Sequence, residues 1–183
     1  MDTSKTHVSI FTHPNHMVSP ELMVWLFKNG FDPKNFVFTR GNGRDVCISY
    51  NIGVKAARDS GLEWMLFCDN DIRPLQGQSA PFLASKADIV CVRYNTGVPL
   101  DWDRPYSFHC GMWRTSKRVL DLLPSPLFKS EYSENGLSRL TCTCDPIRRH
   151  AIIKGLTIEA AGFAGHTPRQ EDGLPTTYRI PCA

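Results

Sequence analysis

The sequence predicts an α/β protein of three layers, in which a mostly parallel central sheet lies between helices. Short apolar runs of strand length alternate along the chain with segments whose apolar residues recur at helical spacing, which is typical of βαβ units. One run, Trp64 to Cys68, is apolar throughout, as expected for a strand that is buried on both faces. The chain has 183 residues, of which 42% are hydrophobic, so it can form one substantial core. We expect a single domain over residues 1–166, followed by a polar tail or lid over residues 167–183.

The part of the chain before Trp64 is expected to form two strands and two helices. The strands are predicted over Val8 to Thr12 and over Asn35 to Thr39. Ser19, followed by a proline and a glutamate, has the pattern of a helix start, and Gly30 stands where that helix would stop. From Asp45 onward the apolar residues recur at helical spacing, which predicts the second helix.

The part after Cys68 is expected to continue the alternation. Further strands are predicted over Ala87 to Val92, Phe108 to Trp113 and Leu156 to Ala161. Thr115 or Ser116 would cap a helix that Pro124 ends, and an Asp-Pro pair at position 145 begins the last helix, which Gly155 closes. Residues 127–143 have little periodicity and predict a long loop over the site.

Charge and cysteine content exclude several classes of protein. The formal net charge of +3 comes without a block of like charges, so the chain tolerates a phosphate-bearing ligand but lacks a nucleic-acid footprint. No apolar stretch is long enough to span a membrane, and the N-terminus does not resemble a signal peptide, so we expect a cytoplasmic protein. Seven cysteines without a regular framework favour reduced thiols. Cys142 and Cys144 form a suggestive pair, but no second pair at zinc-finger spacing accompanies them, so zinc is not predicted.

The strongest functional signal is Asp69-Asn70-Asp71, which comes directly after the apolar run. Ligands of open α/β sheets bind at the carboxyl ends of the strands. In an extended segment the two carboxylates would point the same way, about 6.6 Å apart, and could share one cation. Oxygen ligands favour Mg²⁺ or Mn²⁺. The alternative interpretation is a polar turn, whereas an EF-hand is excluded because Arg73 and Pro74 occupy positions that its loop cannot accept.

The surroundings of this motif resemble the core of GT-A glycosyltransferases, over roughly residues 7–167. In that family an Asn-containing helix leads into a hydrophobic strand that ends in a D-x-D motif, and a later strand carries a glycine beside the donor and acceptor sugars. An acid-bearing helix start, a glycine and a terminal metal-binding His follow. The matching segments are Tyr50 to Ala57, Trp64 to Pro74, Phe108 to Arg114, Pro124, Leu127-Phe128, Cys144-Asp145, Gly155 and Gly165-His166.

The resemblance implies a role for each matching residue. Asp71, with Asp69 and His166, would hold Mn²⁺ or Mg²⁺, and Asp145 would be the catalytic base of an inverting enzyme. An Asp before a proline is also an ordinary N-cap, so Asp145 has a structural alternative. The residues implied in donor binding are Thr12, His13, Arg44, Asn51, Asp69, Asn70 and Gly111.

Two departures and two alternatives accompany this resemblance. The family often has Glu-Asp where this chain has Cys144-Asp145, and the chain is short, so acceptor-binding elements could come from a partner subunit. We expect a nucleoside-diphosphate-sugar donor, with UDP favoured, and an acceptor hydroxyl on a polysaccharide, lipid, protein or modified nucleic acid. The alternatives are a nucleotidyltransferase, whose usual Gly-rich basic loop is missing after Thr12, and a non-catalytic nucleotide-sugar-binding subunit.

Overall fold

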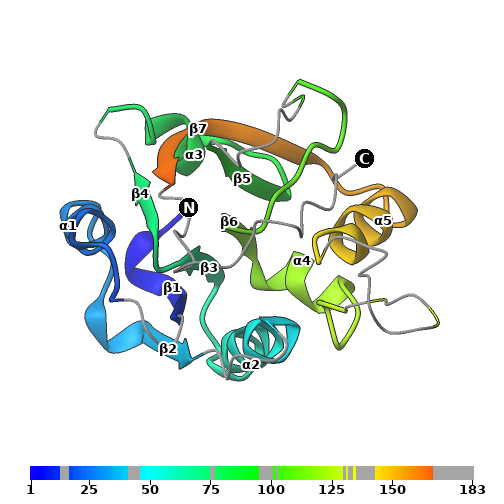
Figure 1. Cartoon of the computed structure of the whole chain (residues 1–183), viewed down its shortest axis with the longest axis horizontal. Helices are drawn as coiled ribbons and strands as arrows, with labels where there is room; N and C mark the ends of the chain where they lie inside the picture. Colours follow the sequence, from blue (N-terminus) through cyan, green and yellow to red (C-terminus); the bar gives the residue numbers. More distant parts are fainter. Residues whose placement is uncertain are drawn as a thin grey trace.

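A seven-stranded sheet organises the part of the chain that the structure, a computed structural model, describes (Figure 1). The described residues are 1–12, 17–40, 46–74, 77–94, 101, 103–129, 131, 134 and 143–166. Across the sheet the strands follow the order β2-β1-β3-β6-β5-β7-β4. Their bounds are Thr6–Thr12 (β1), Phe36–Arg40 (β2), Trp64–Asp69 (β3), Ile72–Pro74 (β4), Ile89–Arg93 (β5), Met112–Ser116 (β6) and Ile158–His166 (β7). The predicted tail, residues 167–183, lies outside the described residues.

Most of these strands run in one direction, and the sheet curls. β1 pairs in parallel with β2 and β3, and β5 pairs in parallel with β7, whereas β6 and β4 run antiparallel to their neighbours. β3 lies near the middle of the strand order and β4 at its edge, yet only two residues separate them in the sequence. Such a connection reaches about 10 Å at most. The β4 edge therefore curls back toward the carboxyl end of β3.

Helices cover both faces of the sheet and enclose two cores. α1 and α3 bury Leu22, Trp25 and Phe82 in the core of one face. On the other face, α2, α4 and α5 pack against a second core that contains Phe67 and Trp113. The helices are α1 (Pro20–Lys28), α2 (Val46–Asp59), α3 (Ala80–Ala84), α4 (Lys117–Leu122) and α5 (Asp145–Ile153), with short 3-10 turns at Thr3–Lys5 and Pro33–Asn35. The predicted three-layer α/β fold with a mostly parallel core is confirmed.

Local signals place several element boundaries. The hydroxyl of Ser19 accepts a hydrogen bond from the backbone N–H of Leu22 at 3.2 Å and caps α1. Gly30 follows this helix with φ of +74°, a conformation that favours glycine. Ser116 caps α4 through the N–H of Val119. These boundaries match the sequence predictions because each depends on residues that are close together along the chain.

The structure corrects two predicted strands and adds one. β6 begins at Met112 rather than at position 108, because the N–H of Gly111 donates to the hydroxyl of Tyr94 instead of to a neighbouring strand. β7 continues to His166, beyond the predicted end at Ala161, because β4 pairs with it there. Strand β4 itself was not predicted, since three residues that include a proline give no pattern. Within the described residues no helix is both long and apolar enough to cross a membrane.

Candidate functional site

Asp69-Asn70-Asp71 marks the point where the chain leaves the sheet at the carboxyl end of β3. Asp69 is the last residue of this strand, and Asn70 and Asp71 form the turn into β4. The segment is therefore a turn rather than the extended stretch expected from the sequence. Asp69 and Asp71 are half-buried, whereas Asn70 is only 1% exposed. The two aspartates thus differ from the residue between them in access to solvent. This alternation suits a motif whose acids meet a ligand while its central residue holds the turn.

Asn70 ties the turn to the start of the chain. Its side-chain Nδ2 donates to the carbonyl of Met17 at 3.0 Å, and its backbone N–H donates to the carbonyl of Phe11, also at 3.0 Å. The backbone N–H of Ser19 in turn donates to the Asn70 carbonyl at 2.7 Å. Met17 and Ser19, which precede α1, are therefore anchored on the end of β3. The predicted donor-binding role of Asn70 stays a prediction beside this structural one.

Asp69 receives its contacts from α2 and from the segment before β6. The hydroxyl of Tyr50 donates to Asp69 Oδ1 at 2.8 Å. Burial, and then the nearby Asp69 carboxylate, raises the pKa of Tyr50 well above its ordinary value of 10.0, so this phenol keeps its proton. The backbone N–H of Asp69 donates to the carbonyl of Gly111 at 2.7 Å. These bonds fix one Asp69 oxygen and its backbone.

Gly111 lies so close to Tyr94 that a Cβ atom at this position would require the tyrosine to shift. A Cβ atom at this position would come within 2.7 Å of Tyr94 Cζ, and the Tyr94 hydroxyl accepts a hydrogen bond from the Gly111 N–H at 3.0 Å. The same hydroxyl contacts Nδ1 of His109, whose ring packs edge-on against the Tyr94 ring at 5.1 Å between centroids. The tyrosine therefore orders the backbone beside Asp69. Neither Tyr50 nor Tyr94 was singled out in the sequence, although Tyr50 lies in one of the segments that resemble the family.

Asp145 begins α5 but is not its N-cap. The cap is Cys144, which makes no side-chain capping hydrogen bond, so the structural alternative proposed for Asp145 is wrong in this respect. The Asp145 carboxylate is half-buried and lies 3.5 Å from Nη1 of Arg148. It lines a small cavity of about 140 Å³ together with Lys129, Glu131, Arg149, His150 and nearby prolines. An acid in a cavity with charged neighbours is placed to meet a polar ligand.

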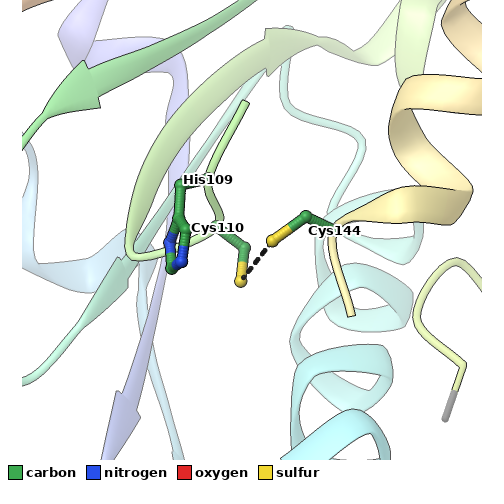
Figure 2. A group of neighbouring side chains, drawn as sticks. All are labelled: His109, Cys110 and Cys144. Carbon is green, nitrogen blue, oxygen red and sulfur yellow. Dashed lines mark hydrogen bonds between the residues drawn. The ribbon is translucent and has the colours of Figure 1, made fainter. Parts of the chain in front are cut away.

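Contacts connect the start of α5 with the end of β3. Cys144 Sγ lies 3.5 Å from Cys110 Sγ, and the residue after Cys110 is Gly111, whose carbonyl accepts from the N–H of Asp69. Figure 2 shows the sulfur atoms of Cys110 and Cys144 pointing toward one another, with His109 beside them. The two cysteines thus connect the residue before Asp145 with the residue before Gly111, whereas the lining of the Asp145 cavity includes neither Asp69 nor Asp71.

The remaining predicted site residues fall at different places. Thr12 is the last residue of β1, and its hydroxyl donates to the carbonyl of Thr39 at 3.4 Å. The backbone of His166 pairs opposite Ile72, the residue directly after Asp71, so β7 returns to the D-x-D segment. His13 and Arg44 lie outside the described residues. The metal-binding role of His166 stays a prediction.

The Asn51 side chain makes three hydrogen bonds to the backbone of the chain itself. Its Oδ1 accepts hydrogen bonds from the backbone N–H groups of Leu127 and Phe128, both at 2.9 Å, and its Nδ2 donates to the Phe128 carbonyl at 2.8 Å. Leu127 and Phe128 were noted in the sequence as a family-like segment, but nothing in the sequence linked them to Asn51. The side chain holds this segment against α2, and its predicted role in donor binding is not tested by these contacts.

Comparisons with known proteins match the fold and not the sequence. No family model matches the chain, and a search of curated proteins also gives no match. Among solved structures, protein A197 from STIV is similar, with 16% identity, a TM-score of 0.58, and coverage of 89% of this chain and 86% of that one. The catalytic domain of Drosophila β1,4-galactosyltransferase 7 with xylobiose has 11% identity and a TM-score of 0.60, with coverage of 92% and 75%.

A second structure of the Drosophila galactosyltransferase contains a mutant with manganese, UDP-Gal and xylobiose. It matches at 13% identity with a TM-score of 0.53, covering 89% of this chain and 71% of that one. At such identities the likeness shows the fold alone. The chain therefore has a GT-A-like fold, shared with glycosyltransferases, and the chemistry has to be argued from its own residues.

Proposed function

We propose that the chain is a metal-dependent glycosyltransferase that moves a sugar from a nucleoside-diphosphate sugar, with UDP favoured, to an acceptor hydroxyl. The observation that carries the proposal is the position of Asp69 and Asp71. Both are half-buried acids at the carboxyl end of β3, where ligands of α/β sheets bind. The GT-A-like fold, shared with a galactosyltransferase that binds manganese and UDP-Gal, supports the proposal.

The donor set of this site fits a hard divalent cation. Two carboxylates stand two positions apart at one turn, and β7 brings the backbone of His166 opposite the following residue. Carboxylate oxygens are the ligands that Mg²⁺ and Mn²⁺ prefer. An imidazole is accepted more readily by Mn²⁺ than by Mg²⁺. A cation held there supplies positive charge to the departing diphosphate. Asp71, Asp69 and His166 are the residues that would hold it.

The other residues of the site position the two substrates. Tyr50 holds one oxygen of Asp69, and Tyr94 holds the backbone of Gly111, whose missing side chain leaves room for the tyrosine ring. Asp145 is the group that would take the proton from the acceptor hydroxyl, because it is a half-buried acid that lines a cavity at the start of α5. Its neighbours in this cavity include Lys129, Glu131 and Arg149, so charged groups of both signs line it and favour a polar acceptor.

The test is transfer or hydrolysis of a panel of UDP-, GDP- and CMP-sugars with Mn²⁺, Mg²⁺ or EDTA. We expect turnover of a UDP-sugar that EDTA abolishes and that Asp71→Asn abolishes without a change in melting temperature. Loss of one charge at a turn should relieve repulsion between the acids rather than disturb packing. Asp59→Asn is the matched control, because Asp59 is an exposed acid at the end of α2 whose partner is Lys55. Full turnover by Asp71→Asn would mean that the motif is only a turn.

A further inference from the structure

Three side chains with soft metal-binding atoms meet beside the candidate site. A ring nitrogen of His109 and the sulfur atoms of Cys110 and Cys144 all lie within 4.8 Å of one another, and the two sulfur atoms are 3.5 Å apart (Figure 2). Positions 109 and 110 belong to the segment before β6, whereas Cys144 caps α5, 34 residues further along the chain. Only the fold brings these groups together.

The separations suit a zinc ion. Tetrahedral zinc at about 2.3 Å from sulfur and about 2.0 Å from nitrogen keeps its ligand atoms about 3.5–3.8 Å apart. The Cys110–Cys144 separation of 3.5 Å is already at that value, and the outer limit of 4.8 Å is within about 1 Å of it. Two thiolates and one imidazole are a ligand set of zinc and a poor one for Mg²⁺ or Mn²⁺.

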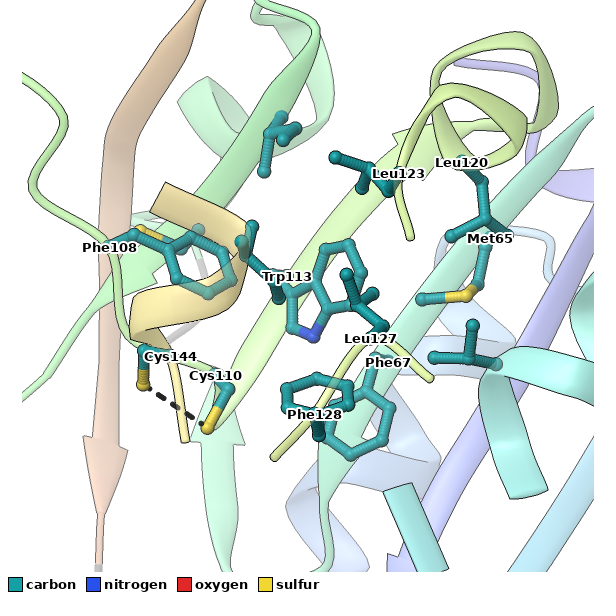
Figure 3. Close-up of a cluster of buried hydrophobic side chains, with 14 of the residues drawn as sticks. Met65, Phe67, Phe108, Cys110, Trp113, Leu120, Leu123, Leu127, Phe128 and Cys144 are labelled. Atoms are coloured by element: carbon teal, nitrogen blue, oxygen red, sulfur yellow. Dashed lines mark hydrogen bonds between the residues drawn. The ribbon is translucent and has the colours of Figure 1, made fainter. Parts of the chain in front are cut away.

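In these surroundings the two sulfur atoms can be thiolates only when a cation is bound, and they are neutral thiols without one. Cys110 and Cys144 are 4% and 1% exposed, at the edge of the aromatic core formed around Trp113 and Phe128 (Figure 3). Buried thiolates are unfavourable unless a positive charge offsets them. The hydroxyl of Tyr94 contacts His109 Nδ1, the type of outer contact that orients an imidazole bound to a metal through its other nitrogen.

We propose that His109, Cys110 and Cys144 form a zinc site, separate from the oxygen ligands of Asp69 and Asp71. His109 binds through Nε2, because Nδ1 is engaged by Tyr94, and a water molecule completes the coordination. Zinc ties the segment before β6 to the start of α5. It thereby sets the position of the two neighbouring residues, Gly111 and Asp145. The site does not depend on the proposed transfer reaction, since its ligands, metal preference and place in the fold are all different.

The experiment is a titration of the reduced, full-length chain with Co²⁺ as a spectroscopic probe for zinc. A thiolate–cobalt charge-transfer band in the near ultraviolet reports sulfur ligands only, so a cation at the aspartates does not contribute to it. We expect the band to saturate at one equivalent and to disappear when Zn²⁺ displaces the cobalt. Cys110→Ala and Cys144→Ala should each lose the saturable band. Loss of a residue that only hydrogen-bonds to a metal ligand weakens metal binding by about 10–100-fold. His109→Ala removes a ligand itself, so it should weaken cobalt binding by more than that.

Two controls separate this site from the rest of the molecule. Cys68→Ala removes a fully buried cysteine from the core on the opposite face of the sheet, and it should keep the band. Asp71→Asn should keep it too, even if that variant shows no turnover, so the two proposals succeed or fail independently. If a cysteine variant does not fold, the half-buried His109→Ala variant decides. Three results would overturn the proposal: cobalt uptake without the band, a saturable band that persists in folded Cys110→Ala or Cys144→Ala, or a Cys110–Cys144 disulfide formed in place of metal binding.

Discussion

Replacing Asn51 by alanine tests whether this side chain holds the fold or a ligand. The change removes the acceptor of the Leu127 and Phe128 N–H groups and the donor to the Phe128 carbonyl. Leu127 and Phe128 are 0% and 1% exposed, so water reaches these groups poorly. Each buried polar group left without a partner costs about 1–3 kcal/mol. Three backbone groups lose their partner, and water that enters the half-buried Asn51 position can hydrogen-bond to some of them. We therefore expect a loss of about 2–4 kcal/mol in unfolding free energy.

The measurement is urea and thermal unfolding of the purified variant. For a chain of this length each kcal/mol shifts the melting temperature by about 2–4 °C, so we expect a fall on the order of 10 °C. Asn51→Asp should fall between wild type and alanine, because it keeps an acceptor for the two N–H groups and loses the donor. Asn35→Ala is the matched control, since its side chain makes one solvent-exposed 3.2 Å bond to the Ser4 carbonyl, and its effect should stay within about 0.5 kcal/mol.

The competing interpretation of Asn51 predicts the opposite result. If Asn51 binds the nucleotide-sugar donor, as the sequence predicts, replacing it by alanine should weaken nucleotide-sugar binding and leave the unfolding free energy nearly unchanged. A loss below about 1 kcal/mol in unfolding free energy would refute the structural reasoning, because even one unsatisfied buried group should exceed it.

Three further variants probe the site and the sheet. Asp145→Ala should lower the transfer rate by about 10²–10⁴ and change stability little, because Asp145 is not the cap of α5. Gly111→Ala should destabilise by about 1–3 kcal/mol in thermal unfolding, since its Cβ would come within 2.7 Å of Tyr94 Cζ. Burial lowers the pKa of His7 below its ordinary 6.5, so the unfolded state binds the proton first as pH falls. Wild type should therefore lose more unfolding free energy below pH 6.5 than His7→Gln.

Each of these variants has a result that contradicts its premise. A near-normal rate for Asp145→Ala would leave that residue as the first residue of a helix and no more. An unchanged melting temperature for Gly111→Ala would mean that Tyr94 moves aside without loss. Equal pH profiles for His7→Gln and wild type would show that His7 has the same affinity for protons in both states.

The sequence by itself determined the features that depend on neighbours along the chain. The start and end of α1 followed from Ser19 and Gly30, because capping involves residues within one turn of the helix. The apolar run of β3 predicted a strand buried on both faces, and Asp69 was expected at its carboxyl end for the same local reason. The α/β class followed from the alternation of such segments, whereas the GT-A-like layout was implied by the resemblance of the D-x-D surroundings to that family.

Tertiary structure alone decided which distant groups meet. The partners of Asn51 lie 76 and 77 residues away, and Cys144 meets Cys110 across 34 residues, so no local spacing could have joined either set. The pairing of β4 with β7 likewise depends on how the sheet curls, and it brings the backbone of His166 opposite Ile72. Local patterns specify backbone conformation within a few residues. Contacts between remote segments depend on the topology of the whole sheet, because the energy that fixes them comes from burying both segments at once.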